Sequence, residues 1–138
     1  MSIDLAVIKN LGGDHLDLPF WEGARRGELL LHRCGICGKH YWPASRCVEH
    51  GGTDMAWVPA SGRGTVHTYT IMHHAYAPRM APHVPYCVAV LKLEEGPFFH
   101  TNIVDCPMEG IHVGLEVAVR FEEDEVSGLT LPVFAPVA

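Results

Sequence analysis

The 138-residue sequence contains no apolar run of about 18 residues, the length that a membrane-spanning helix requires. Its first 18 residues lack the basic start and the long apolar centre of a secretory signal peptide. Basic residues are also scarce, because Lys and Arg number 10 against 16 Asp and Glu, a formal net charge of −6. Such a chain is a poor match for bulk nucleic acid, where neutralisation of phosphates dominates affinity. We expect a cytoplasmic protein of about one domain's length, with no membrane segment.

The short motifs of common active sites are missing too: there is no P-loop, no Gly-x-Gly-x-x-Gly and no Gly-x-Ser-x-Gly. Cys87 and Cys106 lie in or next to apolar segments, where a small buried side chain is the simplest interpretation. Several histidines are scattered over polar segments and loops, namely His67, His73, His74, His83, His100 and His112. We therefore expect no catalysis by the chain on its own, with a stand-alone enzyme as an alternative.

Cysteine is present five times, and an odd number without a signal peptide argues against a disulfide framework. Three cysteines and one histidine form the pattern Cys34-x2-Cys37-x9-Cys47-x2-His50. Pairs of Cys or His ligands two residues apart are typical of tetrahedral structural zinc, and the neighbouring glycines allow tight turns. Four protein ligands leave no coordination position for water, so we do not expect catalysis by this metal.

Two alternatives to this ligand set remain open. Cys34 and Cys37 alone form a Cys-x-x-Cys redox motif, but such a site needs a helix that begins at the first cysteine. Residues 39–43 read Lys-His-Tyr-Trp-Pro, which is not a helix start. The fourth ligand can also be His40 instead of His50. We prefer His50 because it completes a second pair with the same spacing as the first.

Glycine (14) and proline (10) are frequent, which favours many turns and short strands. Residues 1–16 are predicted to be a poorly ordered lead-in, and residues 17–26 a short helix that ends at Gly27. Seven strands are predicted over residues 28–33, 53–60, 65–72, 86–94, 98–104, 115–122 and 129–137. Pro132 and Pro136 suggest that the last of these is an edge strand.

The last five strands, with glycine at their corners, fit a small closed barrel such as the OB-fold. The predicted fold is therefore mainly β, with a lead-in and helix over 1–27, a zinc ribbon over 28–60 and an OB-fold over 61–138. The thirteen-residue loop 73–85 is long for a compact domain, and such loops are often functional. Two surfaces are predicted to be exposed and to contact a partner, the segment Tyr76–Pro85 and the strand Leu131–Val137.

A series of motifs in this order resembles a known family. The motifs are Pro-Phe-Trp at 19–21, Gly-Glu-Leu at 27–29, Cys-x-x-Cys-Gly at 34–38, Tyr-Trp-Pro at 41–43, Trp-Val-Pro-Ala-Ser-Gly-Arg-Gly-Thr-Val at 57–66, Pro-Tyr at 85–86 and Leu-Glu-Glu-Gly-Pro at 93–97. The family is that of the rubredoxin-like zinc ribbon plus OB-fold proteins, long described as a domain of unknown function. The resemblance covers about residues 17–137. The sequence departs from the family at His50, where a second cysteine is usual, and at 44–46, where a basic stretch is reduced to Arg46.

The resemblance implies an accessory subunit of thiolase-like enzymes, or in some cases of MaoC-like hydratases, that act on acyl-CoA. The partner would carry the catalytic residues, while this chain stabilises the complex and helps form its CoA channel, with zinc in a structural role. Since arginine suits phosphate, Arg46, Arg63 and Arg79, together with Lys39, are candidate contacts of the CoA phosphates. Surface charges that serve solubility are the alternative. Two other functions remain open, a single-stranded nucleic-acid-binding OB module and an acyl-CoA carrier.

Overall fold

The computed structural model describes residues 3–10, 13, 15–42 and 44–137, and it is mainly β. Two short helices, α1 (Leu5–Asn10) and α2 (Leu18–Arg25), precede a three-stranded ribbon sheet and a closed five-stranded barrel. The ribbon strands are β1 (Leu30–Cys34), β2 (His40–Tyr41) and β3 (Met55–Pro59); the barrel strands are β4 (Arg63–Met72), β5 (Tyr86–Leu93), β6 (Phe98–Ile103), β7 (Glu116–Glu123) and β8 (Thr130–Pro136). Short 3-10 helices lie at His15–Asp17 (η1), Pro78–His83 (η2) and Met108–Gly110 (η3).

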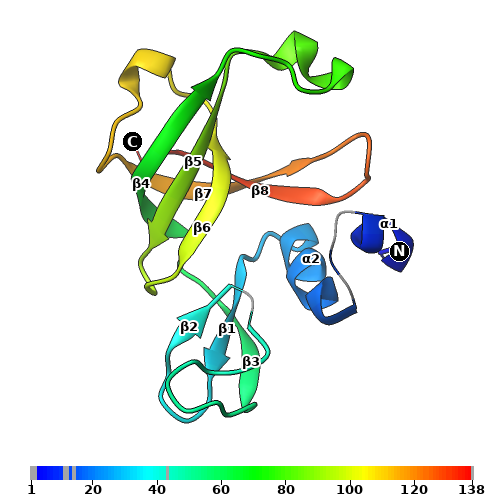
Figure 1. Cartoon of the computed structure of the whole chain (residues 1–138), viewed down its shortest axis with the longest axis vertical. Coiled ribbons are helices and arrows are strands. Elements are labelled where there is room, and N and C mark those ends of the chain that lie inside the picture. Colours follow the sequence, from blue (N-terminus) through cyan, green and yellow to red (C-terminus); the bar gives the residue numbers. More distant parts are fainter. Residues whose placement is uncertain (1–2, 11–12, 14, 43, 138) are drawn as a thin grey trace.

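The ribbon lies at one end of the long axis and the barrel at the other, and the loop with η2 extends from the barrel end that is remote from the ribbon (Figure 1). The strands follow the order β2-β1-β3 in the ribbon and β4-β5-β6-β8-β7 around the barrel. The predicted zinc-ribbon and OB-fold architecture is thus confirmed. None of the helices in the described part of the chain has the length and apolar character of a membrane span.

The ribbon and the barrel share one hydrophobic core. Leu29 and Leu31 at the start of the ribbon belong to the same buried cluster as Phe99 and Phe134 of the barrel. Phe20 of α2 packs between them, with its ring centroid 6.4 Å from that of Phe99. Apolar side chains fill the barrel interior, so the fold is a packed scaffold in which the two parts stabilise each other.

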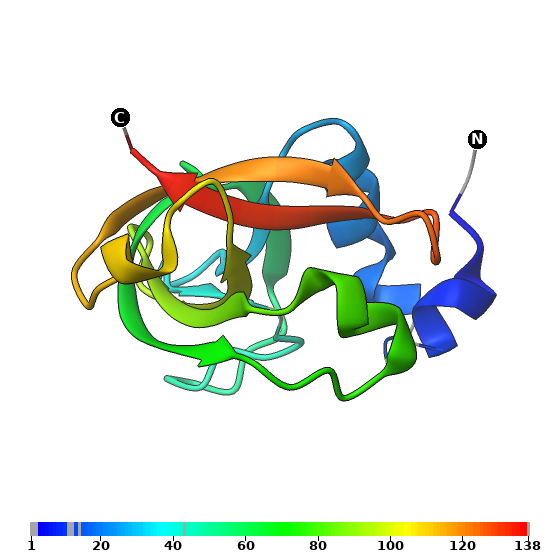
Figure 2. The same ribbon diagram turned by 90° about the horizontal axis from the view of Figure 1, so that it is seen from above.

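The prediction of a poorly ordered lead-in is wrong for residues 5–10, which form α1; its positions 1–2, 11–12 and 14 lie outside the described residues. A six-residue helix has little stability of its own, and tertiary burial holds it here, because Ile8 is 0% exposed. Figure 2 shows α1 beside the hairpin that joins β7 and β8. The predicted helix over 17–26 is confirmed, as residues 18–25 are helical.

The prediction that the last strand is an edge is also wrong, because β8 lies between β7 and β6 in the closed barrel. It pairs with β7 along its whole length, from Thr130 to Pro136, whereas its pairing with β6 is limited to Ile103 and Phe134 in the described residues. The Phe134 carbonyl accepts the Val104 amide on the β6 side. Pro132 and Pro136 lie two residues before and after Phe134, so their backbone nitrogens also face β6. Because neither nitrogen would donate to β7, the two prolines leave the β7 ladder intact.

The two predicted contact surfaces differ in exposure. Tyr76, in the loop before η2, is 76% exposed, as expected. The strand Leu131–Val137 is half-buried to buried and offers no open edge. Cys87 is fully buried on β5, as predicted, but Cys106 is only half-buried because β6 ends three residues earlier.

Candidate metal centre

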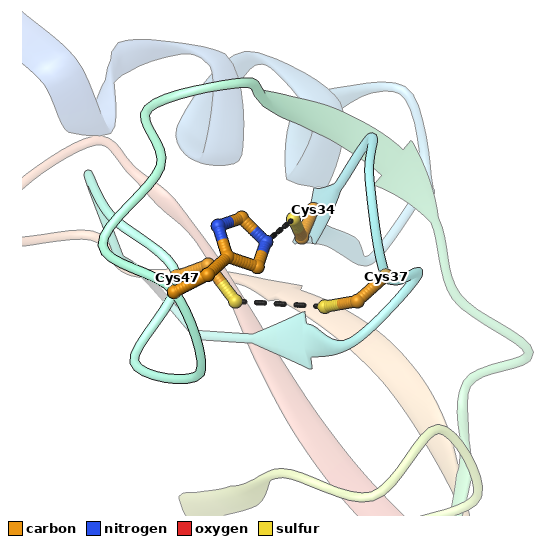
Figure 3. Close-up of side chains that lie close together, drawn as sticks. Cys34, Cys37 and Cys47 are labelled. Carbon is orange, nitrogen blue, oxygen red and sulfur yellow. Dashed lines mark hydrogen bonds between the residues drawn. The ribbon is translucent and has the colours of Figure 1, made fainter.

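Two turns of the ribbon bring Cys34, Cys37, Cys47 and His50 together (Figure 3). One ligand atom from each residue lies within 4.8 Å of all the others. The Cys34 Sγ atom is 3.2 Å from His50 Nε2, and the Cys37 Sγ atom is 3.5 Å from Cys47 Sγ. Zinc–sulfur bonds of about 2.3 Å place two sulfurs of a tetrahedral site about 3.8 Å apart. The donor set and its spacing therefore fit a four-coordinate zinc ion.

The two turns have the same backbone hydrogen bonds. The amide of Gly38 donates to the Cys34 carbonyl at 2.9 Å, and the amide of Gly51 donates to the Cys47 carbonyl at 2.8 Å. In turn, the amides of both cysteines donate to carbonyls five residues further on, each at 2.9 Å. Gly38 and Gly51 have φ values of +77° and +69°, a conformation that glycine adopts without strain. The repeated Cys-x2 spacing thus folds into two matching knuckles.

The alternative fourth ligand, His40, lies outside this cluster. It is on β2, in register with Arg33 of β1, and it is not among the four residues whose ligand atoms converge. The amide of Gly52 donates to His50 Nδ1 at 3.1 Å, so the neutral ring carries its proton on Nε2, which faces the Cys34 sulfur. A metal ion bound at Nε2 would take the place of this proton. The neutral ring would then carry its proton on Nδ1, and Nδ1 could no longer accept the hydrogen bond from the Gly52 amide.

The backbone around the first knuckle favours a thiolate at Cys34. The Cys37 amide, with smaller contributions from the Ile36 amide and the Cys37 and His50 side chains, lowers the pKa of the Cys34 thiol to about 6. The Lys39 amide acts to lower the pKa of Cys37, but the Cys47 thiol, burial and the Cys34 thiolate together raise it. One ligand is therefore ready to bind a cation near neutral pH.

The four predicted CoA contacts do not form one site. Lys39 pairs with Glu49 at 2.8 Å, and Arg46 donates to the Gly51 carbonyl at 3.2 Å, so both are held on the surface of the ribbon. Arg63 opens β4, whereas Arg79 belongs to η2 at the far end of the barrel (Figure 1). The structure thus divides the candidates between opposite ends of the molecule.

Sequence reasoning assigned no site role to His32 or to Trp57, which lie on the ribbon strands that lead to the metal centre. They face each other across β1 and β3, with ring centroids 3.7 Å apart. Burial lowers the pKa of His32 below its usual range. The available signal is the two-residue period of the strand, which places His32 on the same face as Cys34.

Ribbon, ligand cluster and barrel define the class of protein: a rubredoxin-like zinc ribbon joined to an OB-fold. Two family models match these parts, the ChsH2 rubredoxin-like zinc ribbon domain over residues 21–53 and the ChsH2 C-terminal OB-fold domain over residues 57–122. The chain belongs to the DUF35 family and contains both domains, with the zinc ribbon before the OB-fold.

Three relatives set the range of this similarity. A DUF35 domain-containing scaffold protein of Methanocaldococcus jannaschii is 31% identical over 88% of this chain and 87% of its own length. A probable enoyl-CoA hydratase alpha subunit of Thermomonospora curvata is 37% identical over 87% of this chain, which spans only 37% of that relative's length. In solved structures, a chain of the Ltp2-ChsH2(DUF35) aldolase superposes with a TM-score of 0.79 at 32% identity, over 88% of this chain and 94% of that chain.

Proposed function

We propose that the protein is a non-catalytic accessory subunit of a cytoplasmic acyl-CoA-processing complex. Its partner is a thiolase-like enzyme that transfers acyl groups or forms or cleaves carbon–carbon bonds, and this chain stabilises that enzyme. The observation that carries the proposal is the similarity, over both the ribbon and the barrel, to 94% of a chain in the Ltp2-ChsH2(DUF35) aldolase. A reducing cytoplasm also keeps the ribbon thiols available for metal.

Structural zinc at Cys34, Cys37, Cys47 and His50 is part of this proposal. The ion would hold together a ribbon whose own sheet has only three short strands. Metal-binding energy in such small domains is folding energy. Zinc here supplies rigidity to a docking module and no chemistry at a substrate.

Exposed apolar side chains give the proposed scaffold two contact regions. Ile36 and Val48, the apolar residues inside the two knuckles, are 69% and 73% exposed. Tyr76 lies in the loop at the opposite end, beyond the barrel. Apolar groups at such exposed positions often mark association sites. A chain with contact regions at both ends suits a subunit that braces a larger enzyme.

The CoA contacts are the finer part of the proposal. We expect only some of Arg46, Arg63, Arg79 and Lys39 to face the CoA phosphates, because the ribbon and η2 lie at opposite ends of the folded molecule. Arg63 lines a cavity of about 260 Å³ together with Lys92 and two glutamates. On the ribbon, Lys39 is paired with Glu49, whereas Arg46 donates to the backbone carbonyl of Gly51.

A MaoC-like hydratase is the second candidate partner, and the Thermomonospora curvata relative, a hydratase alpha subunit, favours it. Both partners act on acyl-CoA, so the distinction lies in the reaction that depends on this chain. Loss of carbon–carbon bond chemistry on removal of the chain supports the first partner. Loss of water addition to an enoyl-CoA supports the second.

The experiment is co-expression of the chain with candidate thiolase-like and hydratase subunits, followed by size-exclusion chromatography with light scattering and activity assays. We expect a stable complex whose activity falls when this chain is removed. Ile36→Asp and Val48→Asp should weaken the complex, whereas Val113→Asp, at a valine that is 64% exposed in the turn before β7, is the matched control. An enzyme that is soluble, unassociated and fully active alone contradicts the accessory role. Tight, salt-sensitive binding of single-stranded DNA would favour the nucleic-acid alternative.

Arginine variants separate the CoA contacts from the scaffold role. Arg46→Ala, Arg63→Ala and Arg79→Ala are each assayed in the complex, with Lys39→Ala beside them. A contact to CoA phosphate should raise KM for the thioester several-fold and leave the complex intact. Unchanged KM in all four variants would remove the CoA contacts from the proposal while the accessory role stands.

A further inference from the structure

A cavity of about 360 Å³ opens beside the metal centre, between the face of the ribbon sheet and the segment that contains η1. Its lining comes from three parts of the chain: Leu16 and Asp17 from η1, His32, Met55 and Trp57 from the ribbon strands, and Ala44, Ser45 and Thr53 from the loops around the second knuckle. The volume lies in the range of about 300–1,000 Å³ that small-molecule sites occupy. A cavity formed by segments this far apart in sequence depends on the folded ribbon.

His32 is the buried polar group of this cavity, with only 9% of its surface exposed. The Ala44 amide donates to His32 Nδ1 at 3.1 Å, so Nδ1 acts as acceptor and the neutral ring carries its proton on Nε2. Among the described residues, no hydrogen-bond partner of Nε2 is found. Among the described residues the buried side-chain atom without a partner is Glu95 Oε1 and not His32 Nε2, so solvent or an occupant of the cavity can reach this donor. The cavity therefore presents one fixed donor to an occupant.

The remaining lining groups suit a flat ring with both donors and acceptors. Met55 and Trp57 form an apolar wall, and Leu16, at 54% exposure, is an apolar side chain at the entrance. Ser45 and Thr53 contribute hydroxyl groups, which donate or accept as the ligand requires. Small-molecule sites commonly combine mostly apolar walls with a few placed polar groups.

We propose that this cavity binds the adenine ring of an adenine nucleotide, with His32 Nε2–H donating to a ring nitrogen and Trp57 and Met55 packing against the ring. The proposal rests on the proposed function for the source of the nucleotide, which is then the CoA of the acyl-CoA substrate. It places the proposed site of CoA contact at the ribbon end of the molecule.

Charge fixes the direction in which the nucleotide lies. The Asp17 carboxylate is part of the lining, and it repels phosphate but accepts hydrogen bonds from an exocyclic amino group. The base therefore enters and the phosphates remain outside. Arg46 follows Ser45 of the lining directly and is exposed, so it is the nearest of the predicted phosphate contacts along the chain.

The test is isothermal titration calorimetry of the full zinc-loaded chain with adenosine 3′,5′-bisphosphate. Thr53 is exposed, so Thr53→Val removes a hydroxyl group with little effect on folding, and Met55→Trp fills the cavity. We expect measurable binding that weakens about threefold or more in Thr53→Val and is lost in Met55→Trp and in His32→Gln. Thr68→Val, at an exposed position on β4, is the matched control and should bind as the unchanged chain does. Zinc content and circular dichroism identify any variant that fails to fold. The variants that do fold then decide whether the cavity is the binding site.

A second probe, 4′-phosphopantetheine, lacks the base and should not compete for the cavity. Absence of adenosine bisphosphate binding, or binding that is equal in all cavity variants, overturns the proposal. Complex formation with an enzyme is measured separately. A complex without nucleotide binding refutes the adenine site alone, whereas nucleotide binding by a chain that joins no enzyme refutes the accessory role alone.

Discussion

The carboxylate of Glu95 accepts a hydrogen bond of 2.7 Å from the backbone amide of Ser61. Glu95 lies in the turn between β5 and β6, and Ser61 lies in the link between the ribbon and the barrel. The neighbouring Glu94 accepts the Ser61 hydroxyl at 2.8 Å, and this hydroxyl oxygen in turn accepts the Arg63 amide at 3.1 Å. The hairpin turn thus holds the link, and with it the direction in which the ribbon leaves the barrel.

Glu95→Ala should lower the free energy of unfolding by about 1–2 kcal/mol, because it leaves the Ser61 amide without its acceptor. Glu95→Gln retains an acceptor oxygen and should cost less. Urea denaturation followed by circular dichroism measures both, with Glu122→Ala, at an exposed position on β7, as the control. An unchanged midpoint for Glu95→Ala would mean that the shared core alone fixes the link.

Zinc content tests the fourth ligand. We expect about one zinc ion per chain, and His50→Ala should reduce this content while His40→Ala leaves it unchanged. His50→Cys should bind zinc more tightly, because it gives the second knuckle two cysteine ligands. It also avoids moving the histidine proton to Nδ1, where the Gly52 amide already donates a hydrogen bond. Inductively coupled plasma mass spectrometry and competition with a zinc chelator give both quantities. Loss of zinc in His40→Ala, with full retention in His50→Ala, would reassign the ligand.

Removal of the metal should affect the barrel as well as the ribbon. Chelation is expected to expose the amides of β1 to β3 to rapid hydrogen exchange, since structural zinc supplies folding free energy on the order of 10 kcal/mol in small fingers. The barrel should stay folded but melt at a lower temperature, because Leu29 and Leu31 belong to its core. Hydrogen-exchange mass spectrometry and thermal melts resolve the two effects. An unchanged barrel melting temperature would contradict the shared core.

The hairpin between β7 and β8 should lose stability in acid. The Asp124 carboxylate accepts the hydroxyl of Ser127 at 2.6 Å and its amide at 3.2 Å. The Ser127 hydroxyl, with the amides of Ser127 and Val126 and the charge of Arg79, lowers the pKa of Asp124. A lowered folded-state pKa means that the stabilisation is present above the unfolded value of about 3.9 and disappears as pH falls through the folded value.

Asp124→Asn should therefore be less stable than the unchanged chain at pH 7, and the difference should shrink below about pH 4. Denaturant midpoints measured from pH 7 to pH 2.5 show this trend. Glu125→Gln, at the exposed neighbouring position, is the control and should give a small difference at all pH values. A pH-independent difference for Asp124→Asn would exclude the ionised carboxylate as its cause.

Strand patterns in the sequence predict most of the barrel because alternation reports burial directly. β7 is the clearest example, since Val117 is buried while Glu116 and Arg120 are exposed. Proline in β8 led to the wrong prediction of an edge strand. A missing N–H group shows that one side of a strand is poorly paired, but it does not show whether another strand lies on that side. α1 was missed because its stability comes from burial of Ile8 beside the chain that follows the helix, where Gly13 lies, and helix propensity does not record this packing.

The metal cluster was predictable because its spacing is local, with each knuckle closed by residues a few positions apart. Whether the four candidate CoA contacts can act together was less accessible to sequence reasoning, since it depends on where Lys39, Arg46, Arg63 and Arg79 lie in space. His32 was not identified because a lone histidine in a strand has no pattern of its own. Its interest comes from the orientation that the Ala44 amide imposes.

The closure of the barrel at Ile103 and Phe134 has a mechanical consequence. The other strand pairs around the barrel have longer ladders, whereas β6 and β8 share one bridging pair in the described residues. Deformation of the barrel should therefore concentrate there, because few hydrogen bonds must break. The buried Phe134 ring, which contacts Phe99 at a centroid distance of 5.9 Å, resists full opening. We therefore expect any slight change in the circumference of the barrel to occur between β6 and β8, with less change within the longer ladders.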